Sequence, residues 1–229
     1  MKDSKAPLLR TCTIVKRSGV RVQVPESADV VAAELLEVIG RNGSGKTTVL
    51  RSIAGLSVGH ESPPRNRHLR VAYVPAGVPA VRLPFRRFAE FRKRAASLNE
   101  ALDLLGFEHH AKATRFGQLS FGNARKLLIA EALTSQCDIV CIDELFQGLD
   151  SGGERGTEIL VRASMARGVA VVVGGPTRMF AMVEGRVLNL GQASPGSLPN
   201  GQCRLSFVGP TDRSEEFRLY AERLGFRSQ

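Results

Sequence analysis

The run GRNGSGKTT, Gly40 to Thr48, has the residue types and the spacing of a phosphate-binding loop. Phosphate oxygens need several backbone N–H groups at short range, and glycines let the chain curl tightly enough to supply them. Lys46 is expected to reach the β- and γ-phosphates of a nucleotide, and Thr47 to ligate Mg²⁺. The run therefore predicts a nucleoside triphosphate site made by Gly40, Arg41, Asn42, Gly43, Ser44, Gly45, Lys46, Thr47 and Thr48.

Two acids, Asp143 and Glu144, end the apolar run DIVCIDE. Beside a phosphate loop, Asp143 at a strand tip can hold Mg²⁺ through water. Glu144 can polarise the water that attacks the γ-phosphate. We therefore predict Thr47 and Asp143 as metal ligands, and Glu144 and Lys46 as the catalytic residues; taken alone, the acid pair is equally compatible with a solvated turn.

Apolar, strand-like runs alternate with helical segments along the chain, which predicts an α/β fold with a mostly parallel sheet covered on both faces. We expect strands at 34–39, 69–75, 138–144 and 169–175, and helices over 47–56, 84–105 and 123–135. Residues 11–24 alternate around a Ser-Gly turn and predict a β-hairpin. A short strand at 204–208 and a helix at 214–224 are expected near the end of the chain.

The composition of the 229 residues is ordinary for a globular protein, with 43% hydrophobic and 24% charged residues. No apolar run is long enough to span a membrane, and the basic N-terminus does not read as a secretion signal. Four scattered cysteines do not make a disulfide framework, and Cys137 and Cys141 have no histidine near them that would indicate a metal site. These features predict a reduced, cytoplasmic chain.

The net charge of +10 is concentrated in two segments. Residues 1–24 carry six basic groups against one acid, and residues 61–94 carry nine against two. Such a skew is compatible with nucleic acid, an anionic membrane surface or an acidic protein as partner, and also with a solvated basic face.

Together the motifs resemble those of the ABC ATPases, the nucleotide-binding subunits of ABC transporters. The phosphate loop is followed, in that family's order, by YVPAG, LSFGN, CIDE, GLD and VVVGGPT, and the match runs from about residue 11 to 190. The resemblance implies an α/β P-loop NTPase core, an N-terminal antiparallel β subdomain and a small α-helical subdomain. On this basis residues 1–78 form the β subdomain and the phosphate-loop part of the core, 79–135 the helical subdomain, 136–190 the rest of the core, and 191–229 a C-terminal extension.

The resemblance also implies how the chain works, with ATP and Mg²⁺ as cofactors. Two cassettes, identical or not, would pair head to tail, with each ATP between the phosphate loop of one and the signature LSFGN of the other. Ser120 and Gly122 would offer a hydroxyl and an N–H to the γ-phosphate, and Asp150 would line the interface. An integral membrane permease would be the second partner, placing the chain at the inner face of the plasma membrane. The basic run 82–94 would meet that permease or anionic headgroups, or form a solvated amphipathic helix.

The sequence departs from the family's pattern at several positions. Ala76 stands where a glutamine is expected, and Pro176 where a switch histidine is expected. The signature has Phe121 for its first glycine and Asn123 for its glutamine, and residues 1–40 contain no aromatic side chain to stack on adenine. Because the groups that bind phosphate remain while those that sense it are lost, we expect slow or conditional hydrolysis.

Three functions follow from this pattern. The first is the ATP-binding subunit of an ABC transporter, of the exporter type. The second is a soluble ABC-type ATPase acting on nucleic acid or ribosomes, which the basic balance favours and the absence of a second cassette weakens. The third is a non-hydrolysing regulatory cassette that uses ATP only to dimerise.

Overall fold

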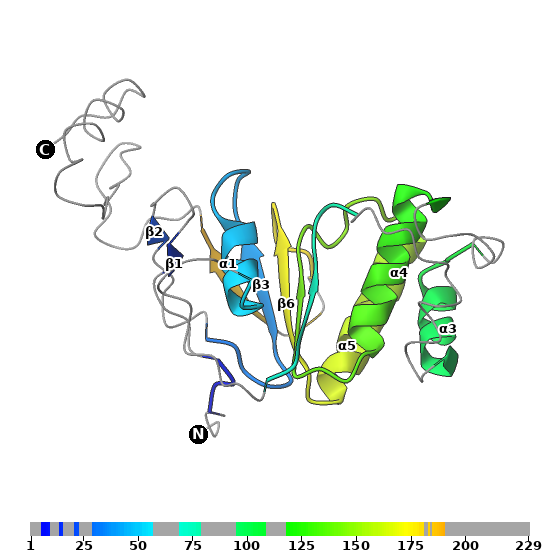
Figure 1. Ribbon diagram of the computed structural model, residues 1–229, viewed down its shortest axis with the longest axis horizontal. Helices are drawn as coiled ribbons and strands as arrows, with labels where there is room; N and C mark the ends of the chain where they lie inside the picture. The colour runs from blue at the N-terminus through cyan, green and yellow to red at the C-terminus, as the bar shows by residue number, and fades with distance from the viewer. Residues whose placement is uncertain are drawn as a thin grey trace, which may run out of the picture.

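Five strands form one parallel sheet in the order β4-β5-β6-β3-β7 (Figure 1). The computed structural model describes residues 6–9, 14–15, 21–22, 29–56, 69–78, 95–108, 118–180, 183 and 185–190. The strands of the sheet are β3 (Leu35–Ile39), β4 (Val71–Val74), β5 (Ile139–Ile142), β6 (Ala170–Gly175) and β7 (Gly185–Asn189). Two short strands, β1 (Ile14–Val15) and β2 (Arg21–Val22), pair antiparallel in a separate ribbon, as the expected hairpin requires.

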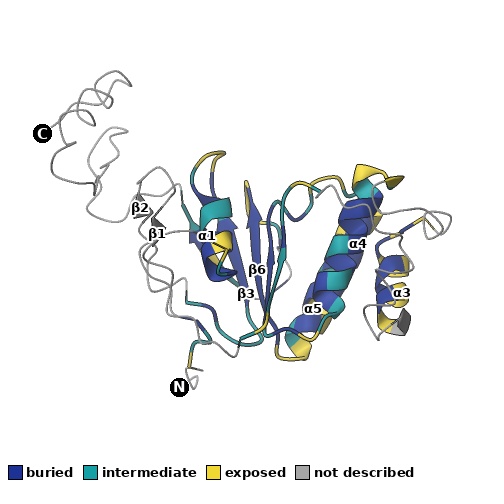
Figure 2. Cartoon of the chain, in the orientation of Figure 1, coloured by how far each residue is buried: buried dark blue, intermediate teal, exposed yellow. Residues whose placement is uncertain are grey.

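Helices cover both faces of the sheet (Figure 2). Helix α1 (Lys46–Ile53) lies on one face, and α4 (Phe121–Thr134) and α5 (Ser151–Ala166) lie on the other, with α3 (Ala95–Leu104) packed outside them. Strand β5 shows why: Ile139 and Cys141 join the apolar cluster that includes α1, whereas Val140 and Ile142 join the cluster beneath α4 and α5. Successive side chains point to opposite faces, so a strand covered on both sides must be apolar throughout.

The α/β class with a parallel sheet is confirmed, and four expected strands fall within one or two residues of their predicted ends. The sequence analysis missed α5, which begins with the glycine-rich SGGERG, and the short strand β7. The helix expected from 123 begins earlier, at Phe121, because Ser120 caps it. The helix expected over 84–105 is present at 95–104; its first part, and the elements expected at 204–208 and 214–224, lie outside the described residues.

Within the described ranges, no helix has both the length and the apolar character that a membrane span requires.

Candidate functional site

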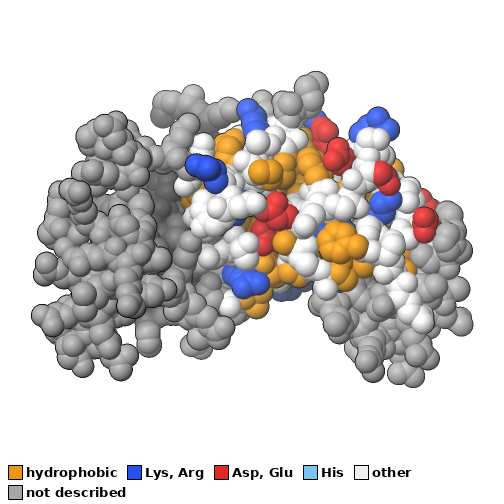
Figure 3. Space-filling view, turned by 90° about the horizontal axis from the view of Figure 1, so that it is seen from above, with side chains coloured by type: hydrophobic (Ala, Val, Ile, Leu, Met, Phe, Trp, Pro, Cys, Tyr) orange, Lys and Arg blue, Asp and Glu red, His pale blue; other side chains and the backbone are white. Residues whose placement is uncertain are grey.

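The motifs of the sequence meet at one edge of the sheet. Because all five strands run parallel, their carboxyl ends lie on the same side, where ligands bind in open α/β sheets. The phosphate loop follows β3, Pro75 and Ala76 follow β4, and the acid pair follows β5. Pro176 follows β6. Seen from above this edge, acidic side chains lie near the middle of the described surface, with basic and apolar side chains around them (Figure 3).

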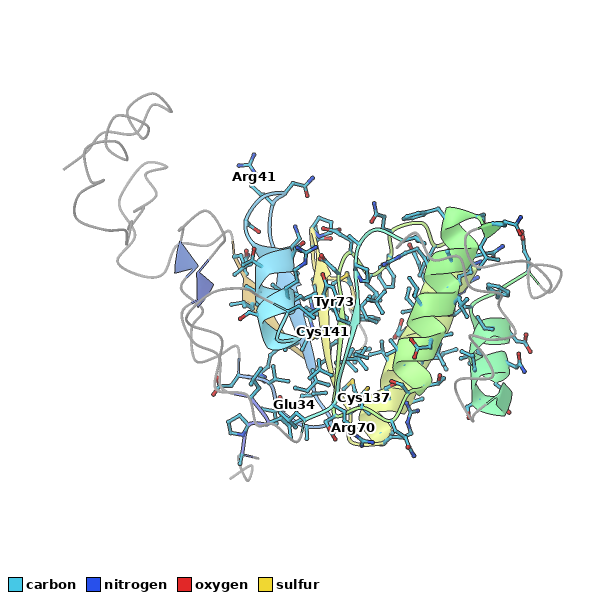
Figure 4. The ribbon with its side chains drawn as sticks, in the orientation of Figure 1. Glu34, Arg41, Arg70, Tyr73, Cys137 and Cys141 are labelled. Carbon is cyan, nitrogen blue, oxygen red and sulfur yellow. The ribbon has the colours of Figure 1, made fainter. Side chains whose placement is uncertain are left out.

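The phosphate loop curls back over the start of α1. Gly43 and Gly45 have φ of 83° and 107°, a region that favours glycine. A Cβ on Gly40 would come within 2.8 Å of Ser44 Oγ. Arg41 is exposed at the tip of the loop, pointing away from the sheet (Figure 4). The first N–H groups of α1, which have no partner within the helix, therefore open onto the loop, as anion binding requires.

Lys46 lies across its own loop and is only 5% exposed. Its Nζ donates to the carbonyl oxygens of Gly40 at 2.9 Å and Arg41 at 3.3 Å. The same nitrogen lies 3.6 Å from Oε1 of Glu144. The ammonium group is thus held at the mouth of the loop, beside the second residue predicted to be catalytic.

Thr47 and Asp143 are joined across the sheet edge. Thr47 Oγ1 donates to Asp143 Oδ2 at 2.6 Å. The other carboxylate oxygen, Oδ1, is buried and has no hydrogen-bond partner in the described part of the chain. A Cβ on Gly174 would come within 3.1 Å of that oxygen. A hydroxyl beside an under-used carboxylate fits Mg²⁺, which takes oxygen ligands and keeps most of its waters.

The signature segment packs against the GLD segment within one chain. Ser120 Oγ accepts a hydrogen bond from the Asn123 N–H at 3.2 Å and so caps α4. The ring of Phe121, whose residue is 45% exposed, covers Gly148, where an added Cβ would lie 2.6 Å from the ring. A Cβ on Gly122 would lie 3.0 Å from the Gly148 carbonyl oxygen. A phenylalanine therefore fits in the first glycine position of the signature because Gly148 has no side chain.

Asp150 already has two partners in the monomer. Its Oδ1 accepts from the Gly153 N–H at 2.7 Å, capping α5, and its Oδ2 accepts from Lys126 Nζ at 2.8 Å. These bonds, the one to Lys126 foremost, lower the pKa of the Asp150 carboxyl. Lys126 also donates to the Gly106 carbonyl at 3.0 Å, so α4, the end of α3 and the GLD segment are joined.

The departures at Ala76 and Pro176 also lie in the described residues. Ala76 follows β4 and Pro176 follows β6, as the sequence analysis placed them, and the four histidines lie outside the described ranges. The segment after β6 is held instead by Glu37 of β3, whose Oε2 accepts from the N–H of Met179 at 2.6 Å. Sequence reasoning missed this residue, and its signal was an acid inside the apolar run LLEVI.

Sequence analysis also did not single out Arg125, which is fully buried in α4 and donates to the carbonyl oxygens of Asp143 and Glu144. The available sign was the pair of basic residues, Arg125 and Lys126, in a helix whose next four residues are apolar.

Comparison with known proteins finds the same family at the level of sequence. The family model described as "ABC transporter" matches residues 25–147. The zinc import ATP-binding protein ZnuC of Ruegeria sp. (strain TM1040) is 34% identical over 151 residues, which are 63% of this chain and 60% of that protein. The cytochrome c biogenesis ATP-binding export protein CcmA of Bradyrhizobium diazoefficiens is 32% identical over 194 residues, covering 78% of this chain and 94% of the relative. The chain thus spans about three fifths of the length of the zinc import relatives.

Solved structures show the same fold. An RNase-L inhibitor superposes with a TM-score of 0.65 at 24% identity, over 76% of this chain and 35% of that one. A dimeric bacterial ABC transporter cassette superposes with a TM-score of 0.58 at 19% identity, over 80% of this chain and 94% of that one. At these identities the likeness concerns the fold alone.

Proposed function

This chain belongs to the ABC transporter family, and from that premise we propose that it is the ATP-binding subunit of an exporter-type transporter, with slow or conditional ATP hydrolysis. The observation that carries the proposal is that two residues at the end of the phosphate loop each contact one of the two acids. Lys46 forms an ion pair with Glu144, and Thr47 donates a hydrogen bond to Asp143. The likeness to the export protein CcmA, which extends over nearly all of that relative, supports the exporter type. The zinc import relatives support an importer instead, over a smaller share of the chain.

The residues at the sheet edge divide the chemistry. Lys46 and the N–H groups of the loop would bind the β- and γ-phosphates. To do so, Lys46 Nζ would give up its hydrogen bonds to the carbonyl oxygens of Gly40 and Arg41. Thr47 and Asp143 would hold Mg²⁺, which when bound supplies positive charge to the phosphate oxygens. Glu144 would orient a water and accept its proton.

Slow turnover is proposed because Ala76 and Pro176 offer no polar side chain to a γ-phosphate. A general base accelerates a reaction about 10²- to 10⁴-fold. The slow hydrolysis that we propose would therefore still depend on Glu144. The partners we propose are a second cassette, with Ser120 and Gly122 facing its nucleotide, and an integral membrane permease at the inner face of the membrane.

The test is Mg-ATP binding by calorimetry together with steady-state phosphate release by the purified chain, its Glu144→Gln variant and a Glu154→Gln control on the exposed start of α5. We expect all three proteins to bind, and the slow rate to fall about 10²-fold only in Glu144→Gln. Failure of the unaltered chain to bind Mg-ATP would overturn the proposal. A rate in the ordinary enzyme range, about 10 s⁻¹, would remove the slow-turnover part.

A second test separates the classes of partner. Co-purification of an integral membrane protein from a detergent extract would support transport. Retention of nucleic acid that falls steeply with ionic strength would favour the alternative of a soluble ATPase acting on nucleic acid.

A further inference from the structure

We propose that Arg125 is a positioning residue for Glu144: its buried guanidinium holds the backbone turn that aims the catalytic carboxylate. This inference rests on the proposed role of Glu144 in hydrolysis, and it assigns a function to a side chain that touches neither the phosphate loop nor a signature residue by any described contact.

Arg125 joins α4 to two segments at the sheet edge. The side chain is 0% exposed. Its Nη2 donates to the backbone carbonyl oxygens of Asp143 at 3.1 Å and Glu144 at 2.9 Å. The same nitrogen lies 3.5 Å from the carbonyl oxygen of Leu145. Its Nη1 donates to the carbonyl of Pro75, at the end of β4. One side chain thus bonds the chain after β4 and the chain after β5.

A buried cation is expensive unless its donors are well used. In the described part of the chain, Nη1 and Nη2 of Arg125 donate to backbone carbonyl oxygens and the buried Nε has no partner. Burial lowers the pKa of the guanidinium, while the charges of Asp143 and Glu144 act in the opposite direction. A leucine would fill the same core position without a desolvation penalty. What arginine adds is a rigid fork of donors and a positive charge bonded to the backbone of the two acids.

The backbone at Glu144 shows what those donors hold. Glu144 has φ of 49°, a left-handed conformation that costs a non-glycine residue about 1–3 kcal/mol. Successive carbonyl groups of a strand point in alternate directions. The carbonyl oxygens of residues 143–145 can all approach Nη2 of Arg125 because the chain turns here. Hydrogen bonds to a charged donor offset the strain of this turn.

The consequence is a separation of turnover from binding. Without Arg125 the turn is free to relax, and the carboxylate of Glu144 moves relative to Lys46, from which it now lies 3.6 Å. Lys46 and Thr47 belong to α1, on the opposite face of the sheet, and keep their positions. The carboxylate of Asp143, although its carbonyl also bonds Arg125, stays held by the 2.6 Å hydrogen bond from Thr47 Oγ1. A displacement of about 1 Å of a reacting group can lower a rate about 10²-fold.

The test compares Arg125→Met and Arg125→Lys in the full chain with Arg162→Met, a control on the exposed side of α5. We expect the Mg-ATP dissociation constant of Arg125→Met to stay within about threefold of the unaltered chain. Its turnover should fall about 10- to 100-fold, with partial recovery in Arg125→Lys. In a Glu144→Gln background the same substitution should lower the residual rate no further, because Arg125 acts through Glu144.

A further loss in the Glu144→Gln background, or an equal loss of binding and turnover, would overturn the inference. Hydrogen exchange of the amides at 143–147 gives an answer that does not depend on turnover. Exchange accelerated in Arg125→Met but not in Arg162→Met supports a held turn, and unchanged exchange rejects it. If the unaltered chain does not bind Mg-ATP, the proposed function fails while the exchange result still decides whether Arg125 holds the turn at Glu144. If Arg125→Met does not fold, Arg125→Lys carries the same measurements.

Discussion

The carboxylate of Glu37 accepts a hydrogen bond of 2.6 Å from the N–H of Met179, which joins β3 to the segment after β6. The same oxygen lies 3.3 Å from the Phe180 nitrogen, and Oε1 lies 3.5 Å from Arg178 Nε. Glu37 is 0% exposed, so these partners replace its water. Glu37 therefore holds the strand that leads into the phosphate loop against the segment that follows Pro176.

Glu37→Leu should strongly destabilise the protein. The change leaves the N–H groups of Met179 and Phe180 without their acceptor and removes the ion pair with the half-exposed Arg178, and each buried donor left unsatisfied costs about 1–3 kcal/mol. Glu37→Gln keeps an acceptor for the N–H groups and should cost about 1–2 kcal/mol. Urea unfolding measures both, with Glu34→Gln, from a part-exposed pair with Arg186, as a control expected within about 1 kcal/mol of the unaltered chain. A Glu37→Leu protein as stable as the original would refute the anchoring role.

Lys46→Ala should weaken Mg-ATP binding while leaving the fold intact. Hydrogen bonds to charged groups contribute about 1.5–3 kcal/mol, so the dissociation constant should rise about 10- to 100-fold. The control is Arg70→Ala at the opposite edge of the sheet (Figure 4), whose guanidinium is exposed beside Asp138. Equal affinities for Lys46→Ala and Arg70→Ala would remove Lys46 from the phosphate site.

Asp150→Asn should lower the melting temperature in a way that depends on pH. The hydrogen bond from Lys126 is the main reason that the pKa of Asp150 in the folded protein lies below its ordinary value of 3.8. Between the folded pKa and the unfolded pKa, the unfolded chain therefore binds more protons than the folded chain. The stabilisation is therefore complete above about pH 5 and is lost as the pH falls through the folded pKa. Asparagine still caps a helix, so the change isolates the ion pair.

Because the Asp150 carboxylate is exposed, the ion pair should contribute only about 0.2–1 kcal/mol, or about 1–3 °C. Melting curves of both proteins between pH 7 and 3 should show a constant gap that closes below about pH 4. In a Lys126→Met background, Asp150→Asn should not change the melting temperature. A difference that persists in that background would argue against the ion pair between Lys126 and Asp150.

Gly156→Ala should destabilise the contact between α3 and α5. A Cβ at this position would lie 2.1 Å from the Leu104 carbonyl oxygen, which is backbone and cannot rotate away. Alanine is the better helix former by about 1 kcal/mol, but overpacking costs about 1–3 kcal/mol or more, so the clash should win. Arg155→Ala, one residue earlier on the exposed side of the helix, provides the control for thermal unfolding. A Gly156→Ala protein more stable than the original would show that the helices can move apart without loss.

Local signals were enough for the parts of this fold that are local. The four apolar strand runs, the phosphate loop and the acid pair were predictable, because burial on both faces and phosphate binding each demand particular residues in sequence. Helix α5 was not, since its glycine-rich start conceals the apolar face that packs on β6. The predicted start of α4 was two residues late because a serine cap is a weaker sign than an apolar period.

The sequence by itself determined that phosphate-binding groups and acids are present, that they follow strands, and that they stand in the order of the ABC transporter family. Only the tertiary structure decided which partners the charged groups have far along the chain: Glu37 has the segment 142 residues away, Lys126 has Asp150, and Arg125 has the turn at Glu144. The physical reason is that a motif is a property of neighbouring residues, whereas the pairing of a buried charge depends on the elements that packing places next to it.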